Sequence, residues 1–182
     1  MIDQKIIDQK IINQELIKVL LVDDDEDDFL LTKSLLFEIP NQKFSIDWAS
    51  SFNSGLKEIE KKEHDIYLID YRLGKKTGVD LLNQVVKLGH KKPIIMLTGK
   101  EDQKIDVDAM KSGAADYLIK DKIDSFILER SIRYAIEHSK GLEAVKKSET
   151  KYRNIFEKSR DIIYITNEEG KFIDFNDSTT KL

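Results

Sequence analysis

The chain contains no cysteine, and its 182 residues include only two prolines and one tryptophan. Without cysteine it forms no disulfide, binds no metal through thiolates and has no cysteine nucleophile. No apolar run approaches the roughly 18 residues that a membrane-spanning helix needs. The N-terminus carries acidic residues and glutamines early and lacks the apolar core of a secretory signal. These absences predict a cytoplasmic protein without a membrane span.

Charge of one sign does not dominate either. The chain has 34 acidic residues and 30 lysines and arginines, which gives a net charge of −4. Nothing global therefore points to a nucleic-acid partner. A hydrophobic content of 40% is enough for a packed core, and the length allows one ordinary domain plus a remainder. We expect an N-terminal extension over 1–15, a domain core over 16–124, a helix over 125–158 and a separate segment over 159–182.

The expected extension repeats every five residues, as IDQKI, IDQKI and INQEL. A period of five fits neither a helix nor a strand. We therefore expect a loosely ordered arm, with a helical arm or an added strand as the alternatives.

Apolar runs then alternate with segments of helical spacing. Such alternation predicts right-handed crossovers and a parallel sheet covered by helices. The central runs are continuously apolar, as strands buried on both faces should be. The predicted strands are 17–22, 44–48, 66–69, 94–97 and 117–119, and the predicted helices are 26–38, 52–62, 78–88 and 102–112.

A long helical pattern follows Lys122. Its first apolar residues are expected to cover the sheet: Phe126, Ile127, Ile132 and Ile136. A thin seven-residue repeat suggests a seam for a parallel homodimer along residues 125–156, although Gly141 weakens it. A single surface helix without a partner is the alternative. The residues of the seam are Leu128, Ala135, Leu142, Val145 and Tyr152.

Chemically useful side chains stand where four of the predicted strands end. Asp23 and Asp24 follow the first strand, Asp70 the third, Thr98 the fourth and Lys120 the fifth. The carboxyl ends of parallel strands meet at one edge of the sheet, so these groups should converge there. Carboxylates suit Mg²⁺, and a carboxylate can attack phosphorus to give an acyl phosphate. A lysine and a hydroxyl can stabilise the charge that develops.

The segments that hold these residues resemble the receiver domain of response regulators in two-component signalling. The matching stretches are VLLVDDDEDDF, DIYLIDYRLGKKTGVDLL, PIIMLTG and GAADYLIKD. The resemblance covers residues 17–124 and implies a flavodoxin-like, doubly wound α/β fold with a five-stranded parallel sheet of order 2-1-3-4-5. It implies a regulatory role rather than an enzymatic one, with a histidine kinase or phosphotransfer protein as partner.

The resemblance also implies a role for each matching residue. Asp70 is expected to accept the phosphoryl group with Mg²⁺ as cofactor, and Lys120 and Thr98 to assist. The expected switch residues are Thr98 and Tyr117, and Gly99 should leave room beside the phosphoryl group. The expected metal ligands are Asp23, Asp24, Asp70 and the main-chain carbonyl of Arg72.

Two positions depart from the family pattern. Gly74 stands where the family commonly has proline, so the loop after Asp70 should be more flexible. Asp121 replaces the proline that usually follows the lysine through a cis bond. We expect a trans bond here, because a cis bond without proline costs about 3 kcal/mol.

Residues 162–166 and 171–175 flank a turn that contains Gly170 and predict a β-hairpin. The stretch 150–182 resembles the opening of a PAS sensor domain, of which a truncated, incomplete part would be present. A longer parent protein with a histidine kinase or cyclase domain is compatible with this arrangement.

Two other functions remain open from the residues. A haloacid-dehalogenase-like phosphatase would use Asp23, Asp25, Thr98 and Lys120, but the usual Gly-Thr is missing and Asp70 would have no role. A receiver that docks partners without being phosphorylated is the second. A P-loop nucleotide site is excluded, because the glycine and Ser/Thr that should flank Gly99-Lys100 are absent.

Overall fold

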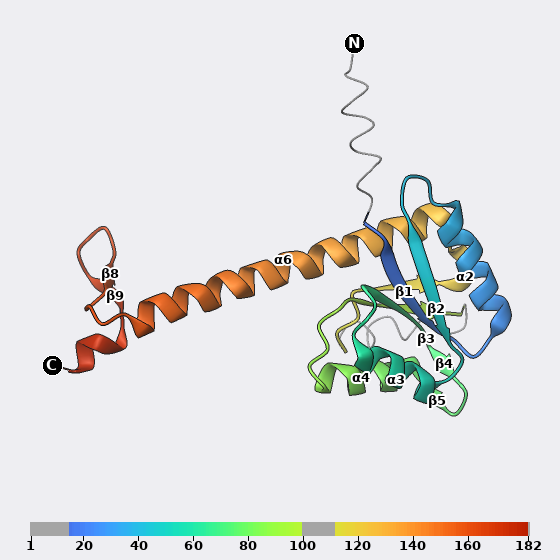
Figure 1. Cartoon of the computed structure of the whole chain (residues 1–182), viewed down its shortest axis with the longest axis horizontal. Helices are drawn as coiled ribbons and strands as arrows, with labels where there is room; N and C mark the ends of the chain where they lie inside the picture. The colour runs from blue at the N-terminus through green and yellow to red at the C-terminus, as the bar shows by residue number, and fades with distance from the viewer. Residues whose placement is uncertain (1–14, 100–111, 182) are drawn as a thin grey trace, which may run out of the picture. The chain divides into compact units, whose positions relative to one another are not determined.

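The computed structural model describes residues 15–99 and 112–181 (Figure 1). The chain divides into two compact units, Met1–Ser139 and Lys140–Leu182. The expected extension over 1–15 and the expected helix over 102–112 fall almost wholly outside the described residues.

The first unit is built on a five-stranded parallel sheet. Its strands lie in the order β2-β1-β3-β6-β7, and each neighbouring pair is parallel. This order confirms the predicted doubly wound sheet, and the strand bounds differ from the predicted ones by a residue at most. The strands are β1 Ile17–Val22, β2 Phe44–Ala49, β3 Ile66–Asp70, β6 Ile94–Thr98 and β7 Asp116–Ile119.

Helices cover both faces of this sheet (Figure 1). On one face lie α2 (Glu26–Glu38) and the first turns of α6 (Ser125–Lys158). On the other lie α3 (Phe52–Lys61) and α4 (Gly78–Lys87). The central strands β3 and β6 are buried along their whole length, and burying each Val, Leu or Ile side chain contributes roughly 1.5–3 kcal/mol.

Helix α6 contributes to the core through Leu128, Ile132 and Ala135, with Ile127 and Ile136 packed beside them. Two expectations about this helix were wrong. Phe126 is 69% exposed and does not cover the sheet. Leu128 and Ala135 are buried against the sheet, so they are not available to a dimer seam. Helical periodicity shows that a face is apolar, but not what covers it.

Side-chain caps fix where two helices begin at the carboxyl edge of the sheet. Asp25 caps α2, where its Oδ1 accepts the N–H of Asp27 at 2.8 Å. Thr77 and Asp80 form a reciprocal capping box at the start of α4. Directly after it, Gly78 lies so close to Asp70 that an added Cβ would stand 2.1 Å from the Asp70 carbonyl oxygen. The start of α4 therefore sets the position of the end of β3.

The loop between β3 and α4 contains a small antiparallel ladder that the sequence did not suggest. It joins β4 (Arg72–Leu73) to β5 (Lys76–Thr77), and Gly74 turns the chain with a φ of 64°. A positive φ suits glycine, which has no Cβ to clash. The expected flexibility of this loop stays a prediction. The bond between Lys120 and Asp121 is trans, since the described residues include no cis peptide.

The second unit contains the end of α6, an antiparallel pair of strands, β8 (Tyr164–Thr166) and β9 (Phe172–Phe175), and the short helix η3 (Asp177–Lys181). Asn176 is its buried polar centre, and its Nδ2 donates to the carbonyls of Phe156 and Asp161 at 2.9 Å each. The predicted hairpin is thus present, whereas its membership of a PAS domain stays a prediction.

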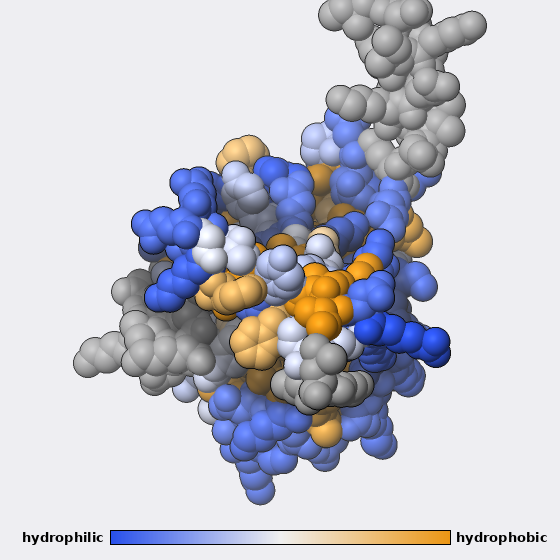
Figure 2. All heavy atoms as spheres, turned by 90° about the vertical axis from the view of Figure 1, so that its left-hand side faces the viewer, coloured by the Kyte–Doolittle hydropathy of each residue, from blue (hydrophilic) through white to orange (hydrophobic). Residues whose placement is uncertain are grey.

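Most apolar side chains of the hairpin face solvent: Tyr164, Ile165, Phe172, Ile173 and Phe175. Apolar surface appears as orange spheres toward the viewer in Figure 2. Even so, none of the helices in the described part of the chain is long and apolar enough to cross a membrane.

Candidate functional site

Three carboxylates meet at the carboxyl edge of the sheet. Asp23 and Asp24 follow β1 and Asp70 ends β3, and one oxygen of each lies within 4.8 Å of the others. Asp23 is 0% exposed and Asp70 6%, whereas Asp24 faces solvent. The predicted convergence of these three residues is present in the structure. Carboxylates held together in this way repel one another unless a cation lies among them.

The Lys120 ammonium provides one such cation. Its Nζ lies 2.8 Å from Asp23 Oδ2, 2.7 Å from Asp70 Oδ1 and 2.6 Å from Asp28 Oδ2. Lys120 follows β7 and opens a short 3₁₀ turn, so the fifth strand delivers it to the same edge as the acids. Three charge-assisted hydrogen bonds occupy the three donors of the ammonium group.

Burial alters the protonation of this cluster. It raises the pKa of Asp23 to about 6, although hydrogen bonds from Lys120 and from the Asp25 N–H oppose the rise. Burial also raises the pKa of Asp70, against the hydrogen bond from Lys120. For Lys120, burial lowers the pKa, but the hydrogen bonds to Asp23, Asp28 and Asp70 together raise it above its ordinary value. Lys120 therefore stays protonated. Burial makes the ionised forms of Asp23 and Asp70 less favourable than they would be in water.

Asp23 and Asp24 are held very differently. Asp23 accepts the Asp25 N–H at 3.0 Å with Oδ1, and its own N–H donates to the carbonyl of Ala49 at 3.1 Å. Asp24 Oδ2 accepts the N–H of Gly74 at 3.2 Å from the loop after β3. The first acid is thus fixed inside the fold, whereas the second lies at its surface and is held there by the Gly74 N–H.

The other expected residues lie along the same edge. Thr98 ends β6, is buried, and carries a hydroxyl without a hydrogen-bond partner among the described residues. Tyr117 lies in β7 opposite Met96 and packs against the core on the side of α3 and α4. The N–H of Arg72 donates to Asp70 Oδ2 at 2.8 Å. Gly99 is half-buried directly after Thr98.

Comparison with known proteins identifies the family to which this chain belongs. A family model for the response regulator receiver domain matches residues 19–132. The chain belongs to the response regulator receiver family. This membership and the five-stranded fold confirm the resemblance for the receiver, but they do not cover the PAS-like stretch. The family match favours the receiver over the phosphatase alternative, and the Asp25 carboxylate, which that phosphatase would use, caps α2.

Curated relatives include the transcriptional regulatory protein FixJ of Rhizobium meliloti, 32% identical over 126 residues, 69% of this chain and 60% of the relative. Another is the transcriptional regulatory protein ZraR of Escherichia coli, 27% identical over 128 residues, 70% of this chain and 28% of the relative. The receiver chain therefore spans between about a quarter and three-fifths of the length of these two relatives.

A solved structure of a response regulator receiver domain protein from Clostridium thermocellum is 30% identical, with a TM-score of 0.62. The matched region covers 69% of this chain and 98% of the Clostridium thermocellum chain. A CheY-like receiver domain protein from Methanospirillum hungatei is 26% identical, with a TM-score of 0.61, and covers 70% and 98%. Both likenesses cover about the length of the first unit.

Receiver domains generally bind Mg²⁺ at an acidic site, and the residues here suit that ion. Mg²⁺ takes oxygen ligands and keeps several waters, so two or three carboxylates at the edge of a sheet meet its needs. The exposure of Asp24 leaves the cluster open to solvent on one side. The three acids that the sequence indicated are the group of possible metal-binding side chains found among the described residues.

Sequence reasoning missed two partners of the receiver site. Asp28 does not directly follow a predicted strand and was not expected at the site, yet its carboxylate contacts Lys120. Trp48 was not considered, yet its indole N–H donates to the main-chain carbonyl of Asp23 at 2.8 Å. Asp28 lies in the first turn of α2, directly after the acids that follow β1. No sequence signal pointed to Trp48, because it comes from another strand.

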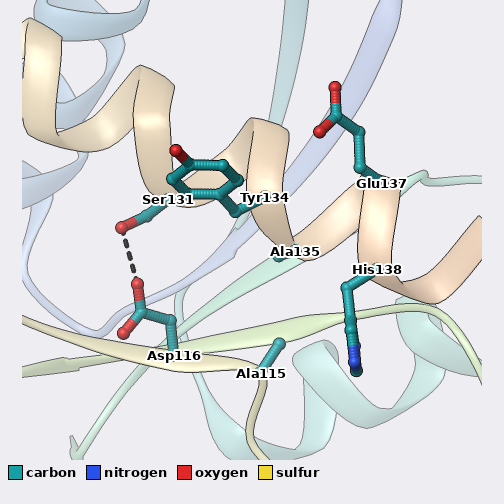
Figure 3. Close-up of a pocket in the computed structure, with 7 residues that line it drawn as sticks. All are labelled: Ala115, Asp116, Ser131, Tyr134, Ala135, Glu137 and His138. Atoms are coloured by element: carbon teal, nitrogen blue, oxygen red, sulfur yellow. Dashed lines mark hydrogen bonds between the residues drawn. The ribbon is translucent and has the colours of Figure 1, made fainter.

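A pocket of about 420 Å³ lies elsewhere in the first unit, between the start of β7 and α6 (Figure 3). Asp116 and Ser131 point toward one another there and share a hydrogen bond of 2.6 Å. The side chains of Glu137 and His138 point away from that pair in different directions (Figure 3). The polar groups do not converge on one point, so this pocket is not built like the acidic edge.

Proposed function

We propose that this receiver accepts a phosphoryl group on the Asp70 carboxylate from a partner histidine kinase or phosphotransfer protein. The observation that carries the proposal is the cluster of Asp23, Asp24 and Asp70 at the carboxyl edge of the sheet, where Lys120 contacts Asp23 and Asp70. Asp23, Asp24, Asp70 and the carbonyl of Arg72 would hold Mg²⁺. When bound, the ion would supply positive charge to the phosphoryl oxygens.

The chemistry is a transfer between two nucleophiles. A bond forms between an Asp70 oxygen and phosphorus while the bond from phosphorus to the donor's imidazole nitrogen breaks, and the imidazole keeps that electron pair. Lys120 already contacts Asp70 Oδ1 at 2.7 Å, so its charge stands where negative charge builds up. The buried hydroxyl of Thr98, which has no hydrogen-bond partner in the described part of the chain, would supply a further donor beside β3.

The same residues support a switch. A phosphoryl group adds roughly −1.5 to −2 charge near pH 7. We propose that the Thr98 hydroxyl turns to a phosphoryl oxygen and that Tyr117 moves inward behind it. Beryllofluoride, a phosphoryl mimic, should then shift NMR signals along β7 as well as those of Asp23 and Asp70. Shifts confined to the acids would contradict the switch.

The phosphoacceptor is tested by mass spectrometry after incubation with Mg²⁺ and a small phosphodonor. The unaltered chain should gain one phosphoryl group, and Asp70→Asn should reduce labelling to background, because an amide is a poor nucleophile. Asp27→Asn, in the exposed first turn of α2, is the matched control and should label normally. Full labelling of Asp70→Asn would overturn the assignment. An unlabelled wild-type chain would favour the docking module instead.

For output, we propose that phosphorylation acts through α6 toward a PAS-type module and a parallel homodimer within residues 125–156, along the part of α6 that follows Ala135. The support is the continuity of α6 and the exposed apolar residues Leu142, Val145 and Tyr152. A chain ending at Ser148 should associate more tightly with beryllofluoride in sedimentation equilibrium. Leu142→Glu should reduce that association, whereas a strictly monomeric chain in both states would contradict the dimer.

The setting of this signalling is proposed as the cytoplasm. The curated relatives are transcriptional regulatory proteins by name, and the receiver chain spans only part of each. We propose no nucleic-acid contact for the residues of this chain.

A further inference from the structure

We infer that Trp48 is a positioning residue of the magnesium site, an inference that rests on the proposed function. Its indole N–H donates to the carbonyl oxygen of Asp23 at 2.8 Å. Trp48 lies in β2, pairs with Leu21 of β1, and reaches the site through a main-chain oxygen rather than through a carboxylate. It acts on the site through the main chain.

The carbonyl that Trp48 holds belongs to the peptide unit between Asp23 and Asp24. A peptide unit is planar, so fixing its oxygen also fixes the direction in which the chain leaves for Asp24. The N–H of Asp23 is held on the preceding peptide by the carbonyl of Ala49 at 3.1 Å. Strand β2 therefore forms hydrogen bonds to both the N–H and the carbonyl of Asp23. The bond to the carbonyl exists only because residue 48 carries a ring N–H.

The indole is itself held in place. Its ring stacks on Phe29 of α2, with centroids 5.0 Å apart and planes 8° from parallel. Trp48 is half-buried and belongs to the packing on the α2 face of the sheet. The donor thus comes from a ring that two elements orient, which limits the freedom that has to be lost when a metal binds.

Asp24 is the acid whose orientation depends most on this hydrogen bond. Asp23 and Asp70 are buried and contact Lys120, whereas Asp24 is exposed and receives the Gly74 N–H at 3.2 Å. A ligand that is already oriented binds more tightly, because less conformational freedom is lost on binding. Loss of the indole hydrogen bond should therefore weaken metal affinity without removing any metal ligand.

Trp48 is the single tryptophan of the chain, so a tryptophan analogue supplied during expression replaces that residue alone. Benzothienylalanine keeps the bicyclic shape but has sulfur in place of the N–H. 5-Fluorotryptophan keeps the N–H and serves as the matched control. The probe is Mn²⁺, whose free concentration is read directly by electron paramagnetic resonance in titrations of the full chain.

We expect the benzothienylalanine protein to bind Mn²⁺ about threefold to tenfold more weakly than the natural chain, the range that one net hydrogen bond gives. Trp48→Phe should show a similar loss, and the 5-fluorotryptophan protein should bind within about twofold of the natural chain, far less than one hydrogen bond would cost. The free energy of unfolding without metal is measured on the same samples, to separate positioning of the ligand from general packing.

Two results would overturn the role of Trp48 alone. One is an unchanged Mn²⁺ affinity in the benzothienylalanine protein, whether or not its stability falls. The other is an equal loss of affinity in the 5-fluorotryptophan protein, which still has the donor. If the natural chain binds no Mn²⁺ at all, the proposed magnesium site falls and the inference falls with it.

Discussion

The two units of this chain differ in how far the strands of their sheets are buried. In the receiver unit, every residue of β3 and β6 is buried between two layers of helices. In the second unit, every residue of β8 and β9 is exposed, although Phe156 and Asn176 form a small buried centre. A sheet between two helix layers completes its own core, whereas a two-stranded ribbon has too few neighbours to do so.

This difference suits the two units to different roles. The buried sheet holds the side chains of Asp23, Asp70 and Thr98 at one edge, and the phosphoryl transfer that we propose needs such precise placement. The hairpin holds no comparable cluster among its described residues, but it presents apolar surface. We therefore expect mutations in the receiver unit to act on stability and chemistry, and mutations in the hairpin to act on association.

The largest expected contrast comes from removing one apolar side chain in each unit. Leu82 is 0% exposed and Phe172 is 64% exposed. Leu82→Ala should lower the free energy of unfolding by about 2–5 kcal/mol, because it leaves a cavity. Phe172→Ala should change it by less than about 0.5 kcal/mol. Hydrogen exchange with mass spectrometry reads each unit separately, and a cost above 2 kcal/mol for Phe172→Ala would mean that the hairpin is covered.

A smaller contrast comes from two glycines. A Cβ on Gly78 would stand 2.1 Å from the Asp70 carbonyl oxygen, whereas one on Gly141 would meet nothing within 4 Å. Gly78→Ala should cost about 1–3 kcal/mol through overpacking and should reduce labelling of Asp70. Gly141→Ala should stabilise α6 by up to about 1 kcal/mol, because alanine is the better helix former. Thermal unfolding measures both, and equal effects of one sign would contradict the structure.

The smallest expected effect is a pH dependence that belongs to the receiver unit alone. Burial lowers the pKa of His90 below its ordinary value of 6.5, and Lys62 and Lys92 add to this. The unfolded chain then binds the proton more readily, so this contribution to stability is present above pH 6.5 and is lost as pH falls toward the folded pKa. Urea unfolding at several pH values should show a flatter acid-side decline in His90→Gln.

Asp23 contributes with the opposite sign over a neighbouring range. Its pKa is raised to about 6 by burial, so its contribution to stability is lost as pH rises from 3.8 through 6. The test for His90 is therefore the difference between the variant and the natural chain at each pH, not either curve alone. Identical curves for the two proteins would show that His90 is not buried as described.

Much of the receiver fold followed from local patterns. The continuous apolar runs predicted the strands, and Asp25 and Ser51 stand as side-chain caps where the first two predicted helices begin. The small ladder after Asp70 escaped prediction, because two-residue strands have too short a pattern to detect. The roles of the site residues stay predictions, although the acids and the lysine do meet as expected.

The sequence by itself determined the order of strands and helices and the placing of Asp23, Asp70 and Lys120 at strand ends. It could do so because a strand buried on both faces must be continuously apolar and must stop where polar residues begin. The tertiary structure alone decided which groups complete the site. Asp28 meets Lys120 across 92 positions of chain, and Trp48 reaches Asp23 from the neighbouring strand. Such contacts depend on how the helices and strands pack together. The local periodicity of the sequence does not show which side chains of different elements will meet.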